Sequence, residues 1–189
     1  MNDTLKLPLQ FDCARLNADL ARIASEDWVP HFNKAYYEGD WSAVPLRSVG
    51  GGARKIYTDP TRPDECADTP ILQRCPYLQE VLRTFECPLR SVRLLRLGAG
   101  ARILEHTDLN LGYEDDEIRI HLPIATNPDV EFFLNSERVR MNAGECWYLN
   151  FNLPHRLFNG GTIDRVHLVI DCKVNDWVRG LFNSALPAG

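Results

Sequence analysis

Two histidines and one aspartate are spaced so that they can bind one divalent metal ion. His106 and Asp108 are two residues apart where a predicted strand ends, and alternate residues of a strand point to the same face. His155 follows later, after enough predicted strand for the chain to fold back beside them. Two imidazoles and a carboxylate leave adjacent coordination positions open, which is the ligand arrangement of non-haem Fe(II) oxygenases. The sequence therefore predicts an Fe(II) centre at which a 2-oxo acid and dioxygen can bind.

Two arginines on predicted strands suit a dicarboxylate cosubstrate. Arg165 alternates with Val166 and Leu168, so its guanidinium is expected to point into the protein, where an uncompensated charge is very costly. The distal carboxylate of 2-oxoglutarate would supply the anionic partner for this guanidinium. Arg119 and His121 are also two residues apart on a predicted strand. We expect this pair to hydrogen-bond the metal-binding carboxylate of the cosubstrate.

The elements that must position these residues are mostly strands. Short β-rich runs separated by turn residues follow residue 90, and this pattern is typical of a sandwich or barrel. Eight short strands preceded by helices predict a mainly β fold, a jelly roll. The predicted strands are Val92–Leu97, Arg102–His106, Glu117–Ala125, Val130–Leu134, Arg138–Met141, Glu145–Asn150, His155–Asn159 and Arg165–Asp171.

The first half of the chain is predicted to be more irregular. Apolar residues at helical spacing predict an amphipathic helix between Phe11 and Val29, with Asp12 as its N-cap. The stretch Asp40–Tyr57, with glycines at its middle, predicts a hairpin. A loop over Thr58–Pro76 and a short helix over Tyr77–Phe85 follow.

Length and composition indicate one domain over residues 1–189, with N-terminal helices, hairpin and loops in 1–90 and the jelly-roll core in 91–175. The net charge is -5 and the basic residues are scattered, which gives no footprint for nucleic acid or an anionic membrane. No apolar run is long enough to cross a bilayer. Six cysteines without a CxxC pair predict reduced thiols, so we expect a cytoplasmic protein.

Seven motifs occur in a fixed order between Val92 and Asp171. They are Leu95-Arg96-Leu97 with Gly100, His106-Thr107-Asp108, Arg119-Ile120-His121-Leu122-Pro123, Gly144-Glu145-Cys146-Trp147-Tyr148-Leu149-Asn150, Pro154-His155, Asn159-Gly160-Gly161 and Arg165-Val166-His167-Leu168-Val169-Ile170-Asp171. In this order and spacing they resemble the aspartyl/asparaginyl β-hydroxylase family of Fe(II)- and 2-oxoglutarate-dependent dioxygenases. Because the best-known animal members have glycine where this chain has Asp108, the resemblance is to the small bacterial single-domain branch, which includes free proline hydroxylases.

The resemblance has implications for fold, ligands and reaction. It implies a cupin-like double-stranded β-helix, with iron on His106, Asp108 and His155. It also implies 2-oxoglutarate on Arg165 and on the pair Arg119 and His121. The expected reaction is hydroxylation of an amino-acid side chain, either free or within a peptide, so the expected partner is a small amino acid or peptide.

Three further residues are candidate substrate contacts, namely Trp41, Arg47 and Arg102, and either arginine would suit a substrate carboxylate. Two other classes of function stay open. One is a cupin-like metal-dependent hydrolase or isomerase with zinc on the same triad, and the other is a non-catalytic binding module on the same barrel. Arg165 also has a competing interpretation as the ion-pair partner of Asp171 or Glu145. The sequence does not determine the oligomeric state.

Overall fold

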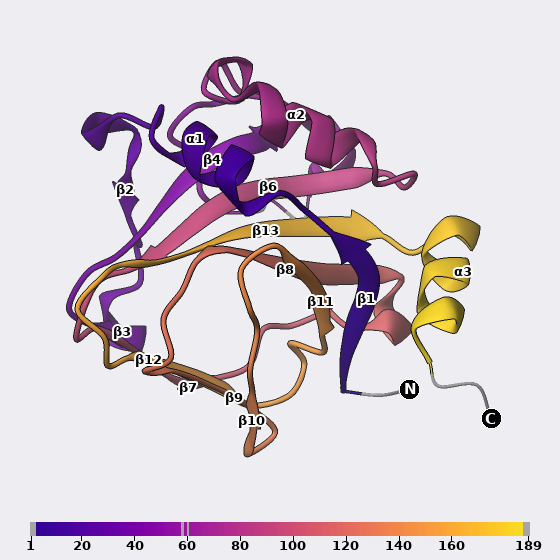
Figure 1. Cartoon of the computed structure of the whole chain (residues 1–189). Helices are drawn as coiled ribbons and strands as arrows, with labels where there is room; N and C mark the ends of the chain where they lie inside the picture. The colour runs from indigo at the N-terminus through magenta and orange to yellow at the C-terminus, as the bar shows by residue number, and fades with distance from the viewer. Residues whose placement is uncertain (1–2, 58, 60, 187–189) are drawn as a thin grey trace.

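Two antiparallel sheets packed face to face make up most of the computed structural model, which describes residues 3–57, 59 and 61–186 (Figure 1). The large sheet contains, in spatial order, β1 (Thr4–Gln10), β11 (Glu145–Leu149), β8 (Glu117–Ala125), β13 (Arg165–Lys173), β6 (Leu89–Leu97), β4 (Trp41–Val49) and β2 (Val29–Pro30), with β5 (Cys66–Asp68) paired to β4. The small sheet contains β10 (Glu137–Val139), β9 (Val130–Leu134), β12 (His155–Asn159), β7 (Arg102–His106) and β3 (Tyr37–Glu38).

Helices cover the large sheet on the side away from the small sheet. α1 (Cys13–Leu20) and α2 (Pro76–Arg83) lie together over this side, and α3 (Asp176–Ala185) stands beside β1 (Figure 1). Short 3-10 helices occupy Ser25–Asp27, Lys34–Tyr36, Pro63–Glu65, Leu72–Arg74 and Tyr113–Asp115. None of the described helices is long and apolar enough to span a membrane. The six cysteines are free thiols within the described residues.

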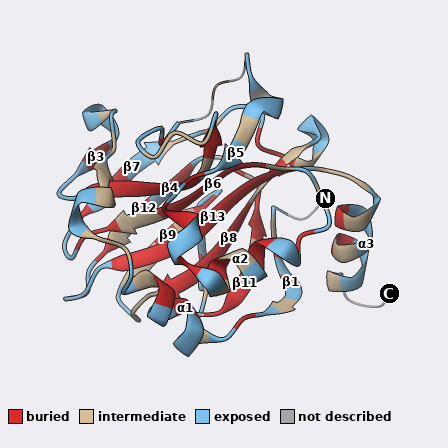
Figure 2. Ribbon diagram, turned by 90° about the horizontal axis from the view of Figure 1, so that it is seen from above, coloured by how far each residue is buried: buried red, intermediate tan, exposed pale blue. Residues whose placement is uncertain are grey.

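The central strands of the large sheet are covered on both faces, and Figure 2 shows them as buried along most of their length. On β13, Val166, Leu168 and Ile170 pack into the apolar cluster beneath the helices. Because alternate residues of a strand face opposite sides, Arg165 and His167 point to the other side, toward the small sheet. The predicted inward orientation of Arg165 is therefore confirmed, and it is 2% exposed.

The predicted mainly β fold is confirmed, and four of the predicted strands, which are β7, β8, β9 and β12, have the expected bounds. Three others differ at their ends, because β6 begins at Leu89, β11 ends at Leu149 and β13 continues to Lys173. The strand predicted over Arg138–Met141 is the shorter β10, one residue earlier at its start. The helix predicted over Tyr77–Phe85 is confirmed as α2, which lies slightly earlier in the chain.

The long helix predicted over Phe11–Val29 is wrong in its extent. Its start is correct, since the Asp12 side chain accepts hydrogen bonds from the first turn of α1, but the helix ends at Leu20. Ile23 and Trp28 still pack against the core, and they lie on either side of the short 3-10 helix Ser25–Asp27. Their apolar character therefore reflects burial and does not require a helix.

The hairpin predicted over Asp40–Tyr57 is also wrong. β4 forms its first arm, and Gly50 and Gly51 turn the chain with φ of 65° and 68°, but the returning partner of β4 is β5. β5 lies inside the predicted loop Thr58–Pro76, of which residues 58 and 60 are outside the described part of the chain. The sequence analysis also omitted β1, β2, β3 and α3.

Candidate metal centre and its cavity

The predicted metal ligands lie together at one end of the small sheet. His106 ends β7 and His155 begins the neighbouring β12, and their Cα atoms are register partners. Asp108 follows β7, where its backbone N–H donates to the Phe151 carbonyl at 2.9 Å. One ligand atom from each of the three side chains lies within 4.8 Å of the other two. The pairing of β7 with β12 thus brings residues that are distant in sequence to one point.

Both histidines have the hydrogen-bonding pattern of metal ligands. His106 Nδ1 is 2.7 Å from the Leu104 carbonyl oxygen, and His155 Nδ1 is 3.0 Å from the Leu153 carbonyl oxygen. A carbonyl only accepts, so each Nδ1 carries the proton and each Nε2 keeps a lone pair for a metal. Burial lowers the pKa of His155 to about 4, which keeps this ring neutral near neutral pH. The donor set fits a divalent transition metal.

Asp108 is held by ion pairs that extend into the large sheet. Arg119 donates to Asp108 and also to both oxygens of Asp171, at 2.6 and 3.0 Å. Asp171 is fully buried and accepts a further hydrogen bond from Arg93 at 2.7 Å. Burial acts to raise the pKa of Asp108, but the charge of Arg119 and of the neighbouring histidines holds it below its usual value. Asp108 is therefore an anionic side chain with a fixed orientation that could serve as a metal ligand.

Arg165 differs from the other buried arginines because no carboxylate among the described residues pairs with it. Its Nη2 donates to His167 Nδ1 at 2.8 Å, and its buried Nε has no hydrogen-bond partner within the described chain. Burial lowers the pKa of this guanidinium to about 9. The structure thus does not support the pairing of Arg165 with Asp171 or Glu145. An anion supplied by a ligand would relieve this unpaired charge.

His121 and His167 form a buried pair behind Arg165, with their Nδ1 atoms 3.3 Å apart. An arginine only donates, so the single lone pair of His167 Nδ1 accepts from Arg165, and the longer contact does not determine the tautomer of His121. His121 Nε2 is buried and unpaired among the described residues. Burial holds the pKa of both rings well below the usual value. A neutral His121 carries one N–H and one lone pair, and it can donate to a carboxylate in the tautomer that has the proton on Nε2.

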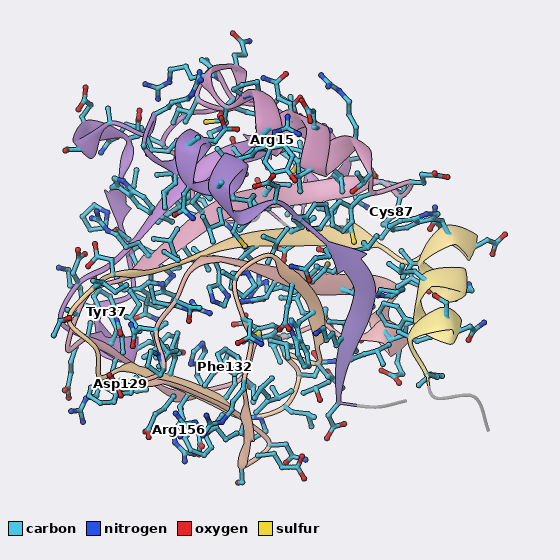
Figure 3. All side chains as sticks on the ribbon, viewed as in Figure 1. Arg15, Tyr37, Cys87, Asp129, Phe132 and Arg156 are labelled. Atoms are coloured by element: carbon cyan, nitrogen blue, oxygen red, sulfur yellow. The ribbon has the colours of Figure 1, made fainter. Side chains whose placement is uncertain are left out.

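One cavity of about 310 Å³ connects these groups. It lies between the two sheets, where Figure 3 shows Phe132 of β9. The predicted residues on its wall are His106, Asp108, His155, Arg119, His121, Arg165 and Trp41. Seven of the predicted site residues therefore line the same cavity.

Two predicted substrate contacts do not line this cavity. Arg47 uses its donors at the outer edge of the large sheet, on the Asp68 carboxylate at 2.7 Å and on the Cys66 and Leu89 carbonyls. Arg102 is exposed, with its Nε 3.3 Å from a Glu38 carboxylate oxygen. Neither arginine is among the residues that line the cavity, and a register shift between Pro45 and Arg47 interrupts the alternation that begins at the cavity-lining Trp41. The two arginines are therefore not substrate contacts in this cavity.

The sequence analysis missed Arg93 and His31, which also line the cavity. Arg93 is 8% exposed on β6, and its buried Nε has no partner in the described chain. Arg93 alternates with Val92 and Leu94 in an apolar strand. The alternation that predicted an inward orientation for Arg165 therefore also predicts one for Arg93. His31 stands in a loop, where no periodic pattern indicates which way a side chain points.

Comparison with known proteins agrees with this geometry. The family model described as Aspartyl/Asparaginyl beta-hydroxylase matches residues 10–174. An L-proline cis-4-hydroxylase of Rhizobium meliloti (strain 1021) is 32% identical, and the match covers 86% of this chain and 58% of that protein. An L-proline cis-3-hydroxylase of a Streptomyces species is 26% identical, covering 86% of this chain and 57% of that protein. The chain therefore spans less than two thirds of the length of these relatives.

Two solved structures share the fold. An oxidoreductase of the 2OG-Fe(II) oxygenase family from Burkholderia pseudomallei has a TM-score of 0.58 at 15% identity, covering 92% of this chain and 86% of that one. A Pseudomonas putida prolyl-4-hydroxylase has a TM-score of 0.55 at 14% identity, covering 93% of this chain and 94% of that one. At these identities the likeness shows the fold alone, whereas the family model covers most of the sequence. The chain belongs to the aspartyl/asparaginyl β-hydroxylase family.

Proposed function

We propose that this chain is an Fe(II)- and 2-oxoglutarate-dependent dioxygenase that hydroxylates a small free amino acid, with L-proline as the first candidate. The observation that carries this proposal is Arg165, a buried guanidinium without a carboxylate partner in the described chain, in the same cavity as a His-Asp-His triad. A zinc hydrolase on the same triad would leave that charge unexplained. Family membership and the names of the hydroxylase relatives support the same conclusion.

Each side of the cavity has a proposed task. His106, Asp108 and His155 would hold the iron, and Arg165 would bind the distal carboxylate of 2-oxoglutarate. When bound, iron, 2-oxoglutarate and dioxygen supply the oxidising chemistry that converts a C–H bond to C–OH with release of succinate and carbon dioxide. Arg119 fixes the orientation of Asp108, and the surrounding apolar side chains exclude water from the reacting atoms.

Arg93 supports an amino acid as the substrate. Its Nη1 and Nη2 are used by the Ile56 carbonyl and by Asp171, which fixes the guanidinium, while its Nε has no partner in the described chain. A carboxylate is the natural partner for such a donor. A cavity of about 310 Å³ is at the small end of ligand cavities, so it favours a small free amino acid over a folded protein substrate.

We also propose one domain over residues 1–189, a cytoplasmic location and a small-molecule partner, with no nucleic acid or membrane partner.

Anaerobic titration of the purified protein with Fe(II) and 2-oxoglutarate tests the proposal. We expect the weak visible charge-transfer band of the iron chelate in the parent protein, and no band in Arg165→Ala at the same cosubstrate concentration. Arg83→Ala, an exposed arginine on α2, is the matched control and should keep the band. Iron binding without a band in the parent would contradict the proposal and favour a hydrolytic metal site or a binding module. Succinate release with L-proline then tests the substrate.

A further inference from the structure

His31 is held rigidly on the cavity wall by contacts on both sides of its ring. The ring stacks on Trp41 with centroids 3.6 Å apart and planes 13° apart, and Phe32 stacks beside it at 4.7 Å. The backbone is fixed as well, since the His31 N–H donates to the Trp41 carbonyl at 2.8 Å and the Tyr37 hydroxyl donates to the His31 carbonyl at 3.0 Å. The imidazole therefore has one defined position.

One nitrogen of the His31 ring has no well-formed hydrogen bond to the described residues. His31 Nδ1 is buried without such a bond, and the neighbouring Asn33 backbone acts to raise the pKa of the ring. Stacking alone could be provided by a phenylalanine, and an unsatisfied buried polar atom destabilises a protein. Burial and the charge of Arg93 lower the pKa of His31 to about 4, so the ring is neutral near neutral pH and one of its nitrogens is an acceptor.

His31 and Arg93 together form a complementary pair on one cavity wall. Arg93 offers a cationic donor through its unpaired Nε, and His31 offers a neutral acceptor. An α-amino acid carries the matching groups, a carboxylate and an ammonium, separated by a single carbon. A ligand with a carboxylate but no ammonium would satisfy Arg93 and leave His31 unpaired.

We propose that the His31 imidazole accepts a hydrogen bond from the substrate ammonium and so makes the enzyme specific for amino acids over other carboxylic acids of the same shape. This inference rests on the proposed function and assigns the substrate amine to a residue. His31 is a specificity-determining residue under this assignment, and it takes no part in iron or 2-oxoglutarate binding.

Calorimetry with two matched ligands tests the assignment. L-Proline and (S)-tetrahydrofuran-2-carboxylate, in which oxygen replaces the ring ammonium, are titrated into protein loaded with 2-oxoglutarate and Mn(II), which prevents turnover. The variants are His31→Phe, which keeps the aromatic stack, and His31→Gln, which restores an acceptor. We expect His31→Phe to weaken L-proline binding about ten- to hundredfold and to leave the oxygen analogue nearly unchanged. His31→Gln should recover part of the loss.

The outcomes separate the two proposals. Unchanged L-proline binding in His31→Phe would overturn the role of His31 and leave the proposed function standing. An equal loss for both ligands would also overturn it, because it would indicate a purely structural role. If the parent does not bind L-proline, both the assignment and the proposed substrate are contradicted, whereas the Fe(II) charge-transfer band in the parent independently tests the oxygenase. The same band in His31→Phe should match the parent.

Discussion

At the scale of single residues, three buried arginines on the large sheet face one cavity but differ in their partners. Arg93 and Arg119 share Asp171, which is fully buried between them. Arg165 has a histidine partner and no carboxylate within the described residues. A buried guanidinium with an anionic partner is a fixed part of the structure, whereas one without a partner would be stabilised by a bound anion. This difference separates the supporting arginines from the one that we assign to the cosubstrate.

Asp171→Asn should therefore destabilise the protein and weaken the metal site. It removes the negative charge that compensates two buried arginines, and losing one partner of a buried ion pair costs about 3 to 5 kcal/mol. Arg119 would also lose the anchor that orients it toward Asp108, so iron affinity should fall by about 10- to 100-fold. Urea unfolding and iron titration measure the two effects.

Asp129→Asn is the matched control for this substitution, because Asp129 is exposed. It should change neither the unfolding free energy nor the iron affinity measurably. If Asp171→Asn behaves like this control in both measurements, the supporting role of the shared carboxylate is wrong.

At the scale of elements, the Glu145 carboxylate on β11 adds side-chain contacts to the backbone pairing that joins β1 to the large sheet. Glu145 accepts hydrogen bonds from Lys6 at 2.6 Å, from the Asn142 backbone N–H at 2.8 Å and from the Trp147 indole N–H at 2.9 Å. Burial opposes ionisation, but these donors, led by Lys6, lower the pKa of Glu145 to about 2. The carboxylate thus ties the β1 edge strand to β11 and to the turn before it.

The stability that Glu145 contributes between β1 and β11 should depend on pH in the acidic range. The pKa of Glu145 is lower in the folded protein than in the unfolded chain, so the folded state binds fewer protons and its stability falls as the pH falls. The contribution of Glu145 to the free energy of unfolding is fully present above the pKa of the unfolded chain, about 4.3, and is lost as the pH approaches about 2. We expect the parent to lose about 2 to 3 kcal/mol from this group over that range.

Glu145→Gln should reduce the acid dependence of the unfolding free energy by that amount, measured by urea unfolding at about pH 5 and about pH 2.5. Glu137→Gln is the control, because Glu137 is exposed on β10. Equal acid dependence in the parent and in Glu145→Gln would contradict the assignment of the acid-sensitive group.

At the scale of the whole molecule, the site is divided between the two sheets. The ligand histidines come from β7 and β12 of the small sheet, whereas Arg119 and Arg165 come from β8 and β13 of the large sheet. Under the proposed function, metal and cosubstrate would bind across the interface between the sheets. A ligand that binds only when both sheets are in place stabilises the folded state by mass action.

Thermal unfolding should therefore reveal both ligands in turn. At about one hundred times the dissociation constant, a ligand contributes about 2.7 kcal/mol, which corresponds to a rise in Tm of about 5 to 10 °C for a chain of this size. We expect Mn(II) to raise the Tm and 2-oxoglutarate to raise it further, and a chelator should abolish both increases. Arg165→Ala should keep the metal increment and lose the second, and a full second increment in this variant would contradict our assignment of Arg165.

The sequence by itself determined the local features of the site. The shared face of Arg119 and His121 and the inward orientation of Arg165 follow from alternation along strands, which depends only on backbone geometry. The same alternation predicted most strands of the jelly roll, because a half-buried strand must place its apolar residues on one face. Residues two apart on one strand can thus be assigned to a common face before any partner is known.

Only the tertiary structure decided which strands meet and which residues from loops join them. The partner of β4 is β5, since hydrogen bonds between strands are not encoded by either strand alone, and the predicted hairpin failed for that reason. Arg47 and Arg93 are both arginines in apolar strands, but pairing of the sheets places Arg93 in the cavity and leaves Arg47 at an edge. His31 enters the site through its stacking on Trp41, a contact that only the folded chain creates.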